Sequence, residues 1–183
     1  MNFQLRWYTD SELSGHKLSL LERSWLCDAG SLTRKLQQYN ASVSLQLSSV
    51  PSSPVLPPER SWLQASSATV LQVREIQWCL NQVPLILARV LLPKQSPSPL
   101  FASFPTYGVR SIGSVLFQPG VISSPLSFAM LTADHAYAKM VYATTRAFPV
   151  GGVWLRRRQF MHKTAKIMVI ELFMPNFLQS LRG

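Results

Sequence analysis

The chain has 183 residues, of which 47% are hydrophobic and only 14% charged, so it can fold around a buried core and is not a disordered segment. Its net charge of +10 raises the question of nucleic-acid binding, but the one tight basic cluster, residues 156–158 (RRR), falls in a predicted strand and alternates between the two strand faces. We therefore expect no nucleic-acid partner, and a basic field that attracts a small anionic metabolite.

The sequence carries no signal for targeting, a metal or a cofactor. The segment 1–13 (MNFQLRWYTDSEL) is charged early and lacks an apolar stretch, so no signal peptide is expected, and no segment reaches the ~18 apolar residues of a membrane span. Cys27 and Cys79 have neither CxxC spacing nor histidine partners, which favours reduced thiols over a disulfide or a metal site. Phosphate-binding loops, GxSxG and HExxH are missing. We expect a cytoplasmic protein without metal or cofactor.

The first quarter of the chain predicts a helical hairpin followed by a strand. Apolar residues recur at helical spacing over 18–27, and Ser31 is placed to cap a second helix over 31–39. Strict alternation of apolar and polar residues at 42–48 predicts a half-buried strand. Residues 49–60 (SVPSSPVLPPER) hold too many prolines for a helix or a central strand, so they predict a loop.

The rest of the chain is predicted to be mostly strands. Two long strands, 69–80 and 84–93, are joined by the turn NQVP and form a hairpin. A short helix follows at 110–117, then an irregular stretch to about residue 133. Three further strands are expected at 136–144, 152–161 and 165–174. The fold class is α+β, with one domain over 1–183, about six mainly antiparallel strands, helices on one side, and 1–16 as a loosely ordered N-terminal extension.

Three charged residues fall on strand faces that are otherwise apolar. Arg74 alternates with Ile76 and Trp78, Glu171 with Val169 and Phe173, and Arg89 with Leu87 and Leu91. Burying an unpaired charge costs several kcal/mol, so each needs a partner or a function. One interpretation is a structural ion pair, between Arg74 and Glu171 or with polar neighbours. The other is a pocket that binds a carboxylate through arginine and a hydroxyl through glutamate, with N–H groups of helix starts at Leu32 and Ile112 added.

The order of short segments between about 25 and 177 resembles the chorismate lyase family. No segment is diagnostic by itself, but their order and spacing are fairly specific, and Arg74 and Glu171 each lie inside the expected strand. The matching segments are SLTRKLQQ at 31–38, VREI at 73–76, LARVLLP at 87–93, IGSVLF at 112–117, VWLRRR at 153–158 and IELFMP at 170–175.

This resemblance implies a cofactor-free lyase that converts chorismate to 4-hydroxybenzoate and pyruvate, the first committed step of ubiquinone biosynthesis. It implies that Arg74 binds the ring carboxylate, that Glu171 meets the ring hydroxyl, and that the amides of Leu32 and Ile112 complete the carboxylate site. We assign Arg89 to the enolpyruvyl carboxylate, as a further substrate-binding residue. The family also implies helical flaps over a buried pocket, and we expect a monomer.

Two departures from the family pattern concern the backbone contact at Leu32, which should survive the change, and the flaps. Leu32 stands where methionine is common, and the regions 49–60 and 118–135 look longer or more divergent than usual. The alternative function from another class is a non-catalytic sensor domain for small aromatic acids, because such domains in bacterial repressors have the same kind of fold. A basic nucleic-acid-binding protein is the third interpretation, and it requires an exposed basic patch over 156–166.

Overall fold

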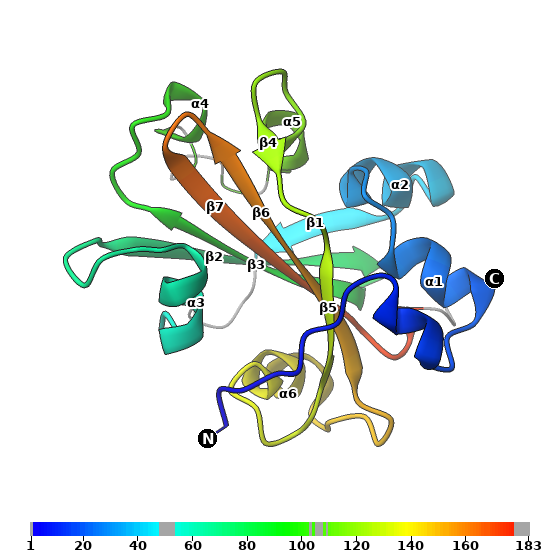
Figure 1. Ribbon diagram of the computed structural model, residues 1–183. Coiled ribbons are helices and arrows are strands. Elements are labelled where there is room, and N and C mark those ends of the chain that lie inside the picture. The colour runs from blue at the N-terminus through cyan, green and yellow to red at the C-terminus, as the bar shows by residue number, and fades with distance from the viewer. Residues whose placement is uncertain (1, 48–53, 103, 105–107, 109, 178–183) are drawn as a thin grey trace.

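The computed structural model describes residues 2–47, 54–102, 104, 108 and 110–177, and these form an α+β fold built on one antiparallel sheet (Figure 1). The helices are α1 (Leu20–Leu26), α2 (Leu32–Tyr39), α3 (Pro57–Trp62), α4 (Pro99–Ala102), α5 (Gly113–Leu116) and α6 (Ala138–Thr145), preceded by the 3-10 turn η1 (Glu12–Gly15). The strands are β1 (Ser44–Leu47), β2 (Leu71–Leu80), β3 (Val83–Pro93), β4 (Ile122–Ser123), β5 (Ser127–Leu131), β6 (Val153–His162) and β7 (Ala165–Phe173).

The described strands follow the order β1-β2-β3-β7-β6-β4, with β5 paired to β6 beside β4, and every pairing is antiparallel. The long strands β2, β3, β6 and β7 agree with the predicted strands to within a few residues. Strands β3 and β7 are central and nearly continuous in buried apolar residues, because both of their faces are covered. The predicted α+β class and antiparallel sheet are confirmed, with seven described strands in place of about six.

Three local predictions are wrong. Residues 138–145 form helix α6 and not a strand, because Ala138 and Val141 lie one helical turn apart and bury the same face. Such short apolar runs fit either period. The proline-rich loop contains helix α3, whose prolines occupy the first helical positions, where a missing N–H is harmless. Residues 127–131, expected to be irregular, form β5. Residues 48–53 lie outside the described residues.

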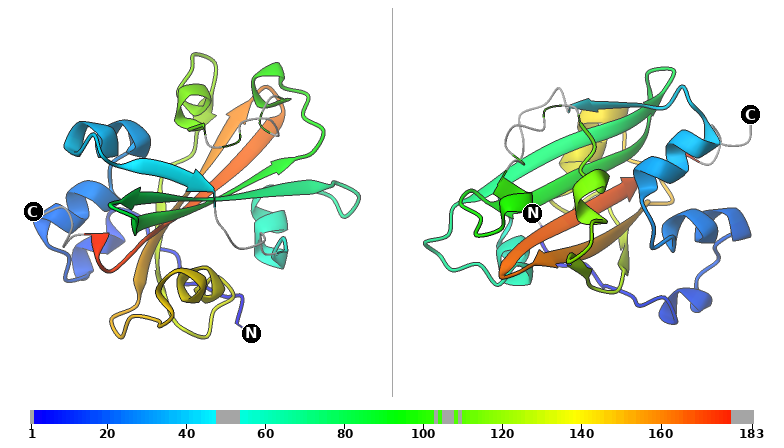
Figure 2. Two further views of the ribbon diagram at one scale, coloured as in Figure 1. Left: turned by 180° about the vertical axis from the view of Figure 1, so that it is seen from behind. Right: turned by 90° about the horizontal axis from the view of Figure 1, so that it is seen from above.

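Alternation along β7 divides the sheet into two faces. Ile167, Val169, Glu171 and Phe173 lie on one face, called the Glu171 face, which packs against α1, α2, α4 and α5. The other face, called the Arg89 face after the β3 residue that lies on it, carries Met168, Ile170 and Leu172 and packs against α3 and α6. Helices therefore cover both faces of the sheet and not one side alone, as the views from behind and above show (Figure 2).

The N-terminal segment packs on the sheet, where a loosely ordered extension was expected. Tyr8 and Phe128 exchange backbone hydrogen bonds of 2.7 and 2.9 Å, which adds the segment to the edge at β5. Leu13 is fully buried in the core beneath α1. None of the described helices is long and apolar enough to cross a membrane.

Candidate functional site

Arg74 and Glu171 lie on the same face of the sheet but do not pair with each other. Arg74 is opposite Val90 of β3, and Val90 is opposite Val169 of β7. Glu171 is in the next row of this face, opposite Ala88. The two charged residues are therefore two strands apart, a lateral separation of about 10 Å. An ion pair between them is excluded, and a ligand between them becomes geometrically reasonable.

Arg74 has hydrogen-bonding capacity that the described residues do not satisfy. Its Nη2 donates to the carbonyl oxygens of Gly108 (2.7 Å) and Arg110 (2.8 Å), while Nε and Nη1 are buried without a hydrogen-bond partner. Burial lowers the pKa of this guanidinium from its ordinary value. Unpaired N–H groups of a buried arginine are costly, and a carboxylate satisfies them with matching planar geometry. Arg74 is therefore the strongest candidate anchor for a carboxylate.

The starts of α2 and α5 meet on the Glu171 face. Ser31 caps α2 by accepting a hydrogen bond from the Arg34 N–H (3.3 Å), and Thr33 and Ser111 share a hydroxyl hydrogen bond of 2.7 Å. Gly113 is needed for this approach, because a Cβ there would lie 2.9 Å from the Ser31 hydroxyl oxygen. Capping by Ser31 thus positions the start of α2, and tertiary contact joins it to the start of α5.

A small pocket of about 60 Å³ lies beneath these helix starts. It brings together three residues expected from the sequence, Leu32, Ile112 and Glu171, but Arg74 is not part of its lining. Early N–H groups of a helix have no intrahelical acceptor, so Leu32 brings a donor to the same pocket as the glutamate. Residues that the sequence reasoning did not assign to the site also line it, among them Thr33, Leu116, Phe160, Arg156 and Arg158.

Glu171 has an ion-pair partner that the sequence reasoning missed. Its Oε2 accepts a hydrogen bond from Nε of Arg156, which lies directly opposite on β6, at 2.5 Å. The side chain of Arg156 is 3% exposed and that of Glu171 17% exposed, so the carboxylate is partly accessible from the pocket. Glu171 thus forms an ion pair with a charged neighbour, and it also lines the pocket.

Arg89 does not lie with these residues. The structure therefore does not bring it to the place where a contact with the substrate was expected. It lies on the opposite face and is fully buried, with Nε and Nη2 donating to the two carboxylate oxygens of Glu59 at 2.6 and 3.0 Å. Nη1 donates to Glu75, and the Tyr137 hydroxyl donates to Glu59 at 2.8 Å. Arg89 therefore fastens α3 and the start of α6 to the Arg89 face. The missed signal was Glu75, the direct cross-strand neighbour of Arg89.

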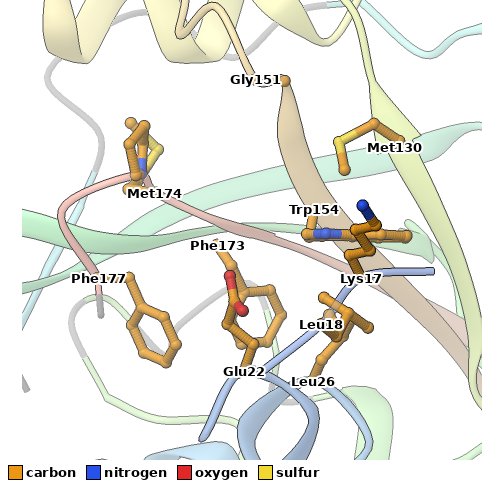
Figure 3. Close-up of a pocket in the computed structure, with 12 residues that line it drawn as sticks. Lys17, Leu18, Glu22, Leu26, Met130, Gly151, Trp154, Phe173, Met174 and Phe177 are labelled. Carbon is orange, nitrogen blue, oxygen red and sulfur yellow. The ribbon is translucent and has the colours of Figure 1, made fainter. Parts of the chain in front are cut away.

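A second cavity of about 300 Å³ opens further along the Glu171 face (Figure 3). Trp154 and Phe173, which are cross-strand neighbours, form its apolar wall, and Lys17 and Glu22 bring its two charged side chains. Glu22 already accepts the Ser19 N–H at 2.8 Å as part of the α1 cap. No arginine lines this cavity. An arginine for a carboxylate and a glutamate for a hydroxyl are found at Arg74 and Glu171 instead.

Comparisons with known proteins show the family of the chain. The sequence pattern of chorismate lyase matches residues 2–181. A probable chorismate pyruvate-lyase of Coxiella burnetii is 31% identical over 185 residues, covering 98% of this chain and 97% of that protein. Another, from a Shewanella species (strain MR-7), is 28% identical over 164 residues, covering 87% and 82%. The effector domain of PhnF from Mycobacterium smegmatis has a similar fold, with a TM-score of 0.52 and 15% identity over 80% of this chain and 90% of that one. The chain belongs to the chorismate lyase family.

Proposed function

We propose that this protein is a lyase that converts chorismate to 4-hydroxybenzoate and pyruvate. The observation that carries the proposal is the arrangement on the Glu171 face: a half-buried arginine with two buried, unpaired nitrogen atoms, a glutamate two strands away, and two helix starts between the sheet and solvent. A planar ring with a carboxylate at one end and a hydroxyl at the other satisfies both charged groups. Family membership supports the choice of chorismate over other cyclic carboxylic acids with a hydroxyl group.

The proposed reaction needs little chemical assistance from the protein. The C–O bond to the enolpyruvyl group breaks, the ring carbon that bears the hydroxyl loses its hydrogen as a proton, and the methylene carbon of the leaving enolpyruvate gains a proton. The ring becomes aromatic, which supplies the driving force. The main task of the site is to hold the substrate in a reactive conformation away from water.

Each site residue takes a separate part in this task. Arg74 holds the ring carboxylate through Nε and Nη1, with N–H groups from the starts of α2 and α5 completing the carboxylate site at Leu32 and Ile112. Glu171 accepts a hydrogen bond from the ring hydroxyl and so orients the carbon that loses its proton. Arg89 has no part in binding the substrate, because its guanidinium is held by Glu59 and Glu75 on the other face.

Three further expectations belong to the same proposal. We infer that the product enters ubiquinone biosynthesis, that the protein acts in the cytoplasm, and that it works as a monomer without a nucleic-acid partner. The placement of residues 156–158 supports the last point. Arg156 and Arg158 donate to backbone carbonyl groups inside the fold, and Arg157 lies over the rings of Trp7 and Trp62, 3.9 and 4.0 Å from their centres. This cluster therefore forms no shared basic surface.

Chorismate turnover by the purified protein tests the proposal. Ultraviolet absorbance follows 4-hydroxybenzoate, and a coupled lactate dehydrogenase reaction follows pyruvate; the two products are expected in equal amounts. Binding of 4-hydroxybenzoate without any chorismate cleavage would favour the sensor alternative, for which the fold shared with the PhnF effector domain is the supporting observation. Neither cleavage nor binding would remove both functions.

A further inference from the structure

One guanidinium connects Glu171 with the corner between α1 and α2. Arg156 is buried on β6, and its Nε donates to Oε2 of Glu171 at 2.5 Å. Its Nη1 donates in another direction, to the carbonyl oxygens of Trp25 (3.2 Å), Leu26 (3.1 Å) and Asp28 (2.7 Å). The Trp25 and Leu26 carbonyl groups are in the last turn of α1 and have no partner within the helix, and Asp28 lies just beyond it. A cation is favourable at this negative end of a helix.

The same corner leads directly into the proposed carboxylate site. Residues 25–29, called the α1–α2 corner, are followed by the Ser31 cap and by Leu32, the first residue of α2. Arg158, two residues further along the same face of β6, donates from Nη1 to the Ala29 carbonyl at 2.5 Å. Arg158 thus also holds the corner, but no hydrogen bond joins it to Glu171 in the described structure.

We propose that Arg156 is a positioning residue that sets the orientation of the Glu171 carboxylate and makes it depend on closure of the α1–α2 corner. The proposal rests on the proposed function. When the corner is closed, three carbonyl groups fix one end of the guanidinium, and the Nε–H fixes the carboxylate oxygen. When the corner moves away, Arg156 loses those acceptors and Glu171 loses its fixed orientation. Substrate enclosure and alignment of the hydroxyl acceptor therefore occur together.

Arginine is required for this role, because its rigid planar group donates from Nε and Nη1 in different directions at once. Lysine keeps the charge but offers a single ammonium group on a flexible chain, which cannot hold both the carboxylate and the three carbonyl groups. Arg156→Lys therefore keeps the positive charge but removes the fixed geometry of the guanidinium donors. Arg158→Lys is the matched comparison, because it weakens the hold on the corner without touching Glu171, and Arg23→Gln controls for an exposed charge.

The experiment measures kcat, KM and the ratio of affinities for 4-hydroxybenzoate and benzoate in folded variants. In Arg156→Lys we expect kcat to fall by about tenfold or more, the loss of a charge-assisted hydrogen bond, and the affinity ratio to fall toward that of Glu171→Gln. The double variant Arg156→Lys with Glu171→Gln should have a kcat no lower than that of Glu171→Gln alone, while its KM rises because the corner is held less firmly. Arg158→Lys should instead raise KM and weaken both ligands equally, because both need the closed corner, which becomes less populated. Arg156 still orients Glu171 whenever the corner is closed, so the affinity ratio stays unchanged.

A purely structural role for Arg156 gives a different pattern: a lower melting temperature, an unchanged affinity ratio, and losses in the double variant that multiply. That pattern would overturn the proposal. If Arg156→Lys does not fold, Glu171→Gln tests the same link from the other end, because losing the ion pair should speed amide hydrogen exchange at Cys27 in the corner and at the adjacent Gly30. Unchanged exchange would also overturn the proposal. The affinity ratio and the exchange rates need no turnover, so they are measurable even if chorismate is not cleaved.

Discussion

Arg74 and Glu171 occupy adjacent rows of one sheet face, two strands apart, and each is held by a group other than its counterpart. Arg74 donates to the carbonyl oxygens of Gly108 and Arg110, and Glu171 accepts from Arg156. The space between them is bordered by Val90 and Val169, which are apolar. A ring with polar groups at its two ends matches this surface.

Replacing Arg74 should separate substrate binding from folding. We expect Arg74→Ala to lose most chorismate cleavage, mainly through a higher KM, because no other described side chain offers two unpaired buried N–H groups next to this face. The loss of its bonds to Gly108 and Arg110 should cost only about 1–3 kcal/mol of unfolding free energy. Turnover and a thermal melt of the same sample provide the check. Wild-type turnover in folded Arg74→Ala would remove Arg74 from the site.

Glu171→Gln should reduce turnover more than product binding. The amide keeps the shape of the carboxylate and still accepts a hydrogen bond from a hydroxyl, so 4-hydroxybenzoate should still bind, more weakly than to the wild type. Turnover falls because the charged acceptor is lost. Titration with 4-hydroxybenzoate and a chorismate assay are run in parallel, with Asp10→Asn, in an exposed ion pair, as the control. An active Glu171→Gln enzyme contradicts the assigned role.

Ligand stabilisation should depend on the hydroxyl group. A ligand at 100 times its dissociation constant stabilises the folded state by about 2.7 kcal/mol, which a thermal shift assay detects readily. We expect 4-hydroxybenzoate to raise the melting temperature more than an equal concentration of benzoate, because benzoate leaves the Glu171 contact unused. Equal shifts for the two ligands would mean that no group in the pocket reads the hydroxyl.

The buried cluster around Arg89 should be structural. Glu59→Gln weakens two charge-assisted hydrogen bonds to Arg89, whose charge Glu75 still neutralises, and should cost about 1.5–3 kcal/mol of unfolding free energy. Asp10→Asn breaks the exposed pair with Arg23 and should cost at most about 1 kcal/mol. Chemical denaturation measures both. The folded fraction of Glu59→Gln should turn over chorismate normally. A specific rise in KM would mean that Arg89 belongs to the substrate site.

The thiol of Cys27 should react slowly in the folded protein. Burial, assisted by Asp10, raises the pKa of Cys27 from 9.0 to about 11, and burial also raises the pKa of Cys79. At pH 8 only about a thousandth of Cys27 is thiolate, so labelling by a disulfide reagent should be slow and should accelerate up to about pH 11. Because the folded pKa is the higher one, the stabilisation from this group is complete below pH 9 and is lost as the pH rises through 11. Rapid labelling of native protein at pH 8 would contradict the burial argument.

The sequence by itself determined the features that depend on local periodicity. Alternation in β2 and β7 placed Arg74 and Glu171 on apolar faces, and the cap of α2 followed from Ser31 with its neighbours. It also separated Arg156 and Arg158 from Arg157, because successive strand residues point to opposite faces. These properties extend over only a few residues and need no knowledge of distant segments.

Only the tertiary structure decided which charges meet. Glu171 pairs with Arg156 because β6 lies beside β7 in one particular register, and Arg89 pairs with Glu59 because α3 packs on the opposite face from the proposed site. A shift of one residue in register would exchange the two faces of a strand, so no local pattern contains this information. Residues 138–145 show the same limit in another form, because their short apolar run fits a strand or a helix, and burial of Val141 against the sheet selected the helix.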